Sequence, residues 1–399
     1  MLTLSSAAKG LFKRAIAQSG VATNVWAVMN SKSTSTATSF GSSLGCKNIK
    51  TLTRCLRGKS WKQIMKEQYK IKTLFHPLRG PTVDGSVIKG FPISQLQQCK
   101  LPLSSVDLLL GFNKDEGTTF VPKLPKWNKR AYKAFSNSIL FFRYGKSSKL
   151  VSELTSFEYA HWNEKSEAQK YRKAAADVAG DFGYKVDIIN FAGAWSKGGA
   201  KTFLYYFSHL PKHLRNPLLG VNHALEVPLI MGKPLYPVGD RMRRNLYITK
   251  FTQDDVTVSL NIMKMWADFA KTGNPGYNWP VYTTSKKEYL NIALKPSVGS
   301  NYNPRMMAFW NYYIPREIQR AAKKTCRMKQ KIHLQGKKPG STGRQRSHVA
   351  RRRSRCCSHY GHRHRTHQRR HFYCWWNHEH RRPRHQYYRR RYFRSKPQR

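Results

Sequence analysis

Acidic residues are scarce in this chain of 399 residues, which has 20 Asp and Glu against 73 Lys and Arg and a formal charge of +53. Such a balance is typical of proteins that bind nucleic acid or an anionic membrane. Much of the excess lies after about residue 325, and the only acidic residue beyond Ile332 is Glu379. The charge therefore marks a separate C-terminal segment and does not define what the rest of the chain does.

Long hydrophobic runs are also absent. No apolar run reaches the roughly 18 residues that cross a bilayer. The opening residues Met1 to Ser5 lack the basic start and the apolar stretch of a secretory signal peptide. We therefore expect no transmembrane segment. Either the protein is cytosolic or its chain begins upstream of Met1, and we favour the second interpretation.

Apolar residues are plentiful enough for a sizeable core, at 40% of the chain. Continuous apolar segments bounded by turn residues predict buried strands at 14–18, 107–111 and 202–207. The residue pattern predicts helical structure at 31–45, 150–198 and 254–272. Strands that alternate with helices are typical of an α/β sheet with helices on its faces.

Four segments follow one another in an informative order. They read GLFKRAIAQSGVATNVWAV from Gly10, LLLGFNKDEG from Leu108, GVNHALEVPLIMGKP from Gly220 and MWADFAKTGNP from Met265. Together they resemble the type B carboxylesterase and cholinesterase family, which includes bile-salt-activated lipase, acetylcholinesterase and the neuroligins. The resemblance covers roughly residues 1 to 315. Four motifs in one order are improbable by chance.

The resemblance implies an incomplete α/β-hydrolase fold, namely the C-terminal part of a mostly parallel sheet with flanking helices. We assign residues 1–320 to this domain. We assign residues 321–399 to a low-complexity, disordered tail rich in Arg and His. A partial sheet is expected to leave an open edge, so that the chain aggregates when it is expressed alone.

Two residues are candidates for a catalytic triad. In the family, the acid follows a sheet strand in a turn like Lys-Asp-Glu-Gly, which places it at Glu116; the matching histidine loop makes His223 the general base and acid. The bland alternatives are a charged surface turn and a buried, hydrogen-bonded histidine. Ser19 matches a serine that supports the acid through a hydrogen bond, although a hydroxyl that caps local backbone is an equal alternative.

The histidine loop departs from the cholinesterase pattern at two positions. Ala224 stands where cholinesterases have glycine, and the lipase branch of the family tolerates alanine there. Leu225 is more unusual, and it puts in doubt whether this loop holds the histidine for catalysis.

The nucleophile should lie on a strand-to-helix turn reading Gly-x-Ser-x-Gly, after a glycine-rich oxyanion loop. We expect both to precede Met1, so that this chain is inactive alone. Gly41-Ser-Ser-Leu-Gly45 fits the pattern literally, with Ser43 as nucleophile. The residues before it are too polar for the buried strand that must launch such a turn, so we consider Ser43 a false match.

The cysteines carry a further implication of the resemblance. Cys46 and Cys55 match a short-loop disulfide of the family, whereas two free buried thiols are the alternative. A bridge requires an oxidising compartment. Cys99 has no evident partner. The tail cysteines Cys356 and Cys357 lack the paired spacing of a zinc site, so we expect no metal.

We therefore predict that the complete protein is a secreted or extracellular carboxylic ester hydrolase that acts on a small ester or lipid and needs no cofactor. The alternative is a non-catalytic adhesion or binding module like the neuroligins. The basic tail could bind anionic partners without specificity, including nucleic acid or acidic lipid. Its alternative is an unstructured or mistranslated extension.

Overall fold

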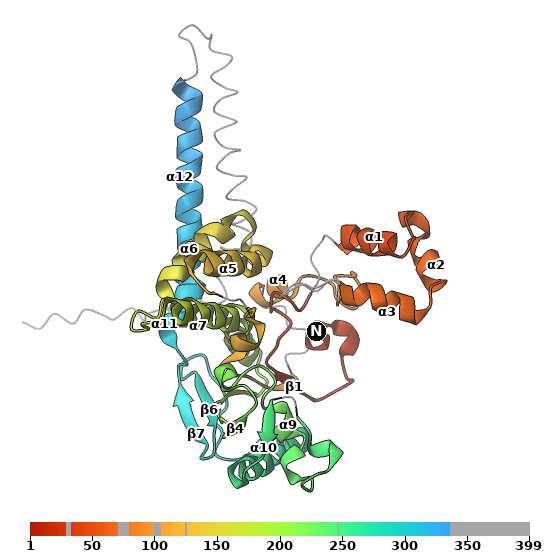
Figure 1. Cartoon of the computed structure of the whole chain (residues 1–399), viewed down its shortest axis with the longest axis vertical. Coiled ribbons are helices and arrows are strands. Elements are labelled where there is room, and N and C mark those ends of the chain that lie inside the picture. The colour runs from red at the N-terminus through yellow and green to blue at the C-terminus, as the bar shows by residue number, and fades with distance from the viewer. Residues whose placement is uncertain (29–32, 71–79, 99–104, 124–125, 246, 336–399) are drawn as a thin grey trace, which may run out of the picture. The chain divides into compact units, whose positions relative to one another are not determined.

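The computed structural model of the chain describes residues 1–28, 33–70, 80–98, 105–123, 126–245 and 247–335 (Figure 1). All of them belong to the first of two compact units, Met1–Ser341. The second unit, Thr342–Arg399, lies outside the described residues, and so does Cys99. The predictions for most of the tail and for Cys99 therefore remain predictions.

Within the described residues, seven strands form two sheets. They are β1 (Arg14–Gln18), β2 (Asp107–Asn113), β3 (Thr202–Phe207), β4 (His213–Leu214), β5 (Ile248–Lys250), β6 (Glu288–Ile292) and β7 (Ser297–Ser300). The main sheet has the order β1-β2-β3-β6-β7. Its first four strands are parallel, and β7 is antiparallel to β6. The pair β4 and β5 forms a small antiparallel sheet.

Alternate side chains of β2 enter two separate cores, because successive residues of a strand point to opposite faces of the sheet. Leu108, Leu110 and Phe112 are buried in one core, and Leu109 is buried in the other. Gly111 lies so close to β3 that a Cβ atom there would overlap the ring of Tyr205. The apolar run in this strand therefore reflects a sheet that is covered on both faces.

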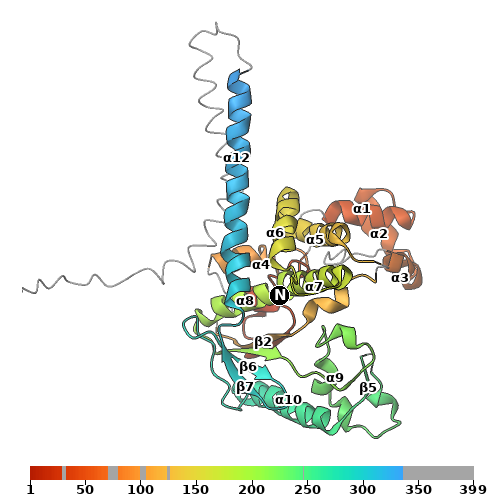
Figure 2. The same ribbon diagram turned by 60° about the vertical axis from the view of Figure 1, so that its left-hand side comes forward.

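Helices supply the rest of the two cores. The first core includes residues of α5 (Lys129–Tyr144), α6 (Ser148–Glu158), α7 (Glu167–Gly180), α8 (Val186–Ser196) and α11 (Pro304–Ala308). The second includes residues of α9 (Val227–Ile230) and α10 (Gln253–Thr272). Figure 2 shows α8 and α10 on opposite sides of the sheet. The mostly parallel sheet with flanking helices confirms the predicted fold class.

The predicted elements match the structure closely where the pattern is strong. The strands predicted at 14–18 and 202–207 have these bounds, and the helix predicted at 254–272 begins one residue earlier, at Gln253. A capping box between Thr252 and Asp255 starts that helix, and Gly273 ends it with a φ of 80°. The segment 150–198 is divided into α6, α7 and α8. The sequence did not reveal α5, β6 or β7.

Residues 33–70 include three short helices, α1 (Ser33–Ser43), α2 (Leu52–Arg57) and α3 (Trp61–Lys70), and α1 contacts both of the others. The predicted disulfide is present between Cys46 and Cys55, whose Cα atoms are 5.7 Å apart. It ties the loop after α1 to α2. A further short helix, α4 (Pro92–Gln97), precedes β2.

Two π-helical turns occur in the described chain. They are η6 (Asp181–Lys185), between α7 and α8, and η10 (Phe309–Tyr313), which leads into α12 (Ile314–Gln335).

The bounds of α12 correct the predicted start of the disordered tail. Residues 321–335 are thus helical, although disorder was expected from residue 321. Ile314 and Ile318, one helical turn apart, are buried in the first core and anchor the start of this helix. Among the described residues, no helix has the length and apolar character needed to cross a bilayer.

The edge strand β1 generates a prediction about self-association. Ile16 is exposed on this strand between Ala15 and Ala17, and an apolar edge strand is a template for pairing with another chain. We expect Ile16→Lys to lower the self-association of this chain in light scattering and sedimentation velocity. The control is Val298→Lys, on an exposed position of the opposite edge strand β7. An equal effect of the two substitutions would contradict a specific role for β1.

Candidate active site

The candidate acid lies directly after the central strand β2. This strand ends at Asn113, and Glu116 begins the 3-10 turn η4 (Glu116–Phe120). Gly117 permits a close approach to α7, because a Cβ atom there would clash with the Ala176 carbonyl oxygen and the Gly180 nitrogen. The turn is thereby pressed onto the helix, and the Glu116 side chain is fully buried.

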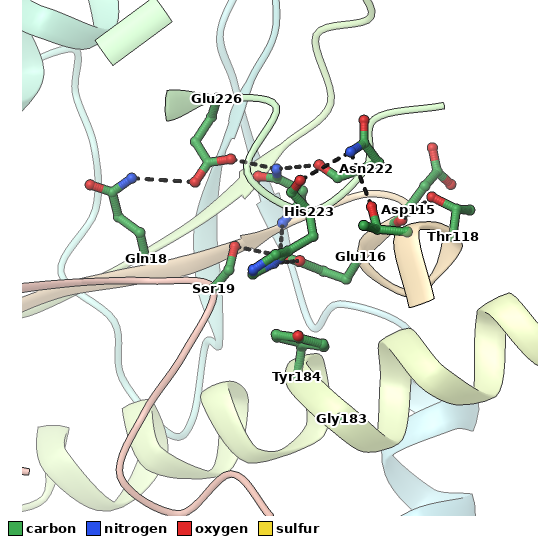
Figure 3. Close-up of polar contacts among 12 residues, drawn as sticks. Gln18, Ser19, Asp115, Glu116, Thr118, Gly183, Tyr184, Asn222, His223 and Glu226 are labelled. Carbon is green, nitrogen blue, oxygen red and sulfur yellow. Dashed lines mark hydrogen bonds and ion pairs between the residues drawn. The ribbon is translucent and has the colours of Figure 1, made fainter. Parts of the chain in front are cut away.

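Three groups bind the Glu116 carboxylate (Figure 3). Oε1 accepts the Ser19 hydroxyl at 2.5 Å and the Asn113 backbone N–H at 2.7 Å. Oε2 lies 2.7 Å from Nδ1 of His223. The structure therefore brings together Ser19, Glu116 and His223, the three residues that the sequence had singled out. Ser19 has a φ of 48° directly after β1, a left-handed conformation that aims its hydroxyl inward.

The histidine loop lies between the 3-10 turn η7 (Pro217–Leu219) and α9. It is joined to the acid loop because Asp115 N–H donates to the Val221 carbonyl at 2.9 Å, and Asp115 Oδ2 accepts the Val221 N–H at 2.8 Å. Ala224 adopts a φ of 66°, the left-handed region that favours glycine. Leu225 is fully buried in the second core, so it anchors the loop.

Two aromatic rings flank the imidazole. The ring centroid of Tyr184, on the π-helical turn η6, lies 4.9 Å from that of His223, and the centroid of Phe120 lies 5.4 Å from it. The Tyr184 and Phe120 rings are stacked on each other at 5.4 Å. The side chain of His223 keeps 31% of its surface exposed. The base is therefore held on one side and open on another.

A second buried carboxylate, Glu226, lies close to the pair. It accepts hydrogen bonds from the Asn113 amide at 2.5 Å and from the Gln18 amide at 3.3 Å. The same Asn113 amide donates to the Asn222 carbonyl at 2.8 Å. Asn113 thus connects β2, the acid and the histidine loop. Among the described residues, no group of three His, Cys, Asp or Glu side chains could hold a metal.

Burial and charge shift the pKa values of two of these groups. Burial lowers the pKa of His223, but the hydrogen bond and charge of Glu116 and the charge of Glu226 raise it, and the net direction is upward. Burial and the charge of Glu116 raise the pKa of Glu226, against the hydrogen bonds that it accepts. The site therefore favours a protonated imidazole beside Glu116.

Ser43 lies elsewhere in the structure. It is exposed at the end of α1, where its hydroxyl donates to the Phe40 carbonyl at 2.7 Å. No strand leads into α1 within the described residues around it, so Ser43 does not stand on a strand-to-helix elbow. Its match to Gly-x-Ser-x-Gly is a coincidence of local sequence.

Several residues of the site were missed from the sequence. Asn113 lies two residues past the predicted strand 107–111, within the LLLGFNKDEG motif, and Glu226 closes the His-Ala-Leu-Glu motif that predicted the base. Both were therefore within reach of the motifs. Tyr184 had no such signal, because it lies about 40 residues before His223 in a helical region and reaches the site only through the π-helical turn.

A carboxylate after one parallel strand and a histidine after its neighbour define the chain as an α/β-hydrolase-type protein. The model of the Carboxylesterase family matches residues 1–310, and the chain belongs to this family. It is 28% identical over 335 residues to acetylcholinesterase of Bungarus fasciatus, covering 79% of this chain and 53% of that protein. It is also 28% identical over 343 residues to neuroligin-3 of Mus musculus and of Homo sapiens, covering 79% of this chain and 40% and 39% of those proteins. The chain thus spans about half or less of the length of these relatives.

The close contact at Gly117 predicts a stability effect. Gly117→Ala should lower the free energy of unfolding by about 1–3 kcal/mol, because the added methyl group meets backbone atoms of α7 that cannot rotate away. Urea unfolding measures the change. Gly58→Ala is the control, since Gly58 has a φ of −79° and its nearest contact would be an ordinary 3.4 Å. Equal effects would contradict the packing of η4 on α7.

The raised pKa of His223 predicts a pH-dependent contribution to stability. A group whose pKa is higher in the folded state stabilises the fold fully below its unfolded pKa of about 6.5, and this contribution is lost as the pH rises through the folded value. The stability difference between the wild type and His223→Gln should therefore be largest below about pH 6.5 and shrink at higher pH. Urea unfolding across this range measures it. A difference that does not vary with pH would contradict the ion pair.

Proposed function

We propose that the protein to which this chain belongs hydrolyses carboxylic esters, with Glu116 as the acid and His223 as the general base of a serine triad. The observation that carries this proposal is the hydrogen bond between a fully buried carboxylate and Nδ1 of a partly exposed imidazole. Because Glu116 occupies Nδ1, Nε2 is the nitrogen left to exchange a proton with a nucleophile.

The residues would act in two half-reactions. In the first, Nε2 of His223 takes the proton of a serine hydroxyl as its oxygen attacks the ester carbonyl, and then gives that proton to the departing alcohol. In the second, Nε2 takes a proton from water, the resulting hydroxide attacks the acyl-serine, and the serine recovers its proton as the carboxylic acid leaves. Glu116 stabilises the imidazolium in both.

We propose that the serine comes from sequence outside this chain. The two serines that the sequence offered have other partners, since Ser19 donates to Glu116 and Ser43 donates to its own helix. The nucleophile of an α/β hydrolase stands on a strand-to-helix turn of the same sheet. The edge strand β1 is where a further parallel strand could pair.

The substrate class and the location follow from the same proposal. A family of carboxylesterases implies an ester substrate, and we propose a small ester or a lipid ester. The disulfide between Cys46 and Cys55 is favoured by an oxidising compartment, which supports a secreted or extracellular protein.

Ester turnover by the complete product of the gene is the test. Hydrolysis of p-nitrophenyl butyrate should lose about 10³–10⁴-fold in kcat/KM in His223→Gln and in Glu116→Gln, because each removes the base or its orienting partner. A fluorophosphonate probe with peptide mass mapping should label a serine outside residues 1–399. Label on Ser43 or Ser19 would overturn the assignment of the nucleophile.

His161→Gln is the matched control for this experiment. His161 also faces a carboxylate, with its Nε2 atom 2.7 Å from Asp177 Oδ2, but it does not contact Glu116 or His223. We expect its turnover to equal that of the wild type. An active protein in which His223→Gln has no greater effect than His161→Gln would exclude the triad.

A non-catalytic adhesion module is the second candidate. It is favoured by neuroligin-3, to which the chain is as similar, at 28% identity, as it is to acetylcholinesterase. The retained pair of Glu116 and His223 argues for the hydrolase. A complete protein that binds a cell-surface partner, shows no ester turnover and takes no fluorophosphonate label would establish the adhesion module.

A further inference from the structure

The π-helical turn η6 contains buried groups that the triad does not use. All five of its residues, Asp181 to Lys185, are buried. Lys185 Nζ lies 3.0 Å from Asp181 Oδ1, and the two side chains are 9% and 8% exposed. A buried ion pair does not by itself favour folding, because removing two charges from water costs several kcal/mol. The ion pair encloses Tyr184, which contacts the candidate base, so we looked for a role of the pair at the site.

The ion pair is tied to the C-terminal part of the fold. Asp181 Oδ2 accepts the Tyr159 hydroxyl at 2.9 Å, and the Tyr159 oxygen accepts the Trp310 indole N–H at 2.6 Å. Phe182 packs on the Trp310 ring with centroids 5.6 Å apart. One end of the turn is thus fixed by Tyr159, which directly follows α6, and by Trp310 of η10.

The other end of the turn is fixed by the segment after β1. The Gly183 carbonyl accepts the Asn24 amide at 2.8 Å and the Trp26 indole N–H at 2.9 Å. A π-helical turn displaces carbonyl groups from regular helical hydrogen bonding, and these two donors satisfy the displaced group. The backbone on either side of Tyr184 is therefore held on both flanks.

Tyr184 lies on this fixed segment of backbone, and its ring contacts the candidate base His223. Its ring lies below the pair of Glu116 and His223 in Figure 3, at 4.9 Å from the imidazole and at an interplanar angle of 43°. A cation within about 6 Å of an aromatic ring is attracted to its face. The contact therefore strengthens when His223 becomes an imidazolium.

We infer that the π-helical turn Asp181–Lys185, closed by its buried ion pair, is a positioning device that holds the ring of Tyr184 against His223. The inference rests on the proposed role of His223 as the base. Tyr184 and Lys185 are then positioning residues that act through the imidazole. Their effect should be greatest in the step that creates the imidazolium.

The pH at which His223 becomes reactive tests this inference in the full chain. Diethyl pyrocarbonate acylates a histidine only when its imidazole is neutral, and peptide mass mapping distinguishes modification of His223 from modification of other residues. Tyr184→Leu should lower the midpoint of His223 modification by about half a pH unit, because the ring face is lost. Tyr184→Phe keeps the ring and should restore the wild-type midpoint. The charged groups that face His223 are otherwise Glu116 and Glu226, which both variants retain.

The ion pair is tested by a double substitution. Asp181→Asn with Lys185→Met leaves no unpaired buried charge, and it should shift the His223 midpoint in the same direction as Tyr184→Leu. The matched control is Lys133→Met with Glu153→Gln, which removes an exposed ion pair between α5 and α6. A double variant that fails to fold leaves the comparison of Tyr184→Leu with Tyr184→Phe to decide.

The outcomes separate this inference from the proposed function. An unchanged midpoint in Tyr184→Leu, or an equal loss in Tyr184→Phe, would overturn the positioning role. Glu116→Gln should lower the midpoint by more than Tyr184→Leu, because it removes a direct charge and its hydrogen bond. If Glu116→Gln has no effect, the acid and base pair itself fails, and the proposed function fails with it.

Discussion

The buried carboxylate of Glu116 constrains the architecture around it. A charge with no exposure to water is tolerated only where donors replace its hydration. Those donors come from three parts of the chain, the Ser19 hydroxyl after β1, the Asn113 N–H at the end of β2 and the His223 imidazole after β3. Neighbouring parallel strands must therefore end at the same edge, in register, for the charge to be stabilised.

Only some parts of the fold and of the site could be predicted from the sequence. The strands β2 and β3 could be predicted, because both are covered on both faces of the sheet and their sequences are continuous apolar segments. Glu116 and His223 could, because the resemblance placed each in a short motif. β6 could not, because it is short and only Leu290 and Ile292 are buried in it. β7 could not, because it is a short, largely exposed edge strand with small residues such as Ser297 and Gly299.

Contacts between segments that are distant in the sequence could not be predicted, because they depend on details of the folded backbone. A helical pattern identifies residues 181–185 as part of a helix, but the insertion of one extra residue per turn changes which side chain faces the base. Tyr184 reaches His223 only because of that change. The sequence alone also could not show what the unusual Leu225 does in the histidine loop. Its full burial in one cluster with Val221 and Leu229 depends on how the loop folds back onto the second core.

Two buried carboxylates lie near His223, and their hydrogen-bond partners differ. Glu116 accepts bonds from a hydroxyl, a backbone N–H and the imidazole, whereas Glu226 is bound by two amide side chains. Burial and the negative charge of Glu116 raise the pKa of Glu226. The imidazole faces Glu116 through its Nδ1 atom, at 2.7 Å from Oε2, and this leaves Nε2 for a nucleophile.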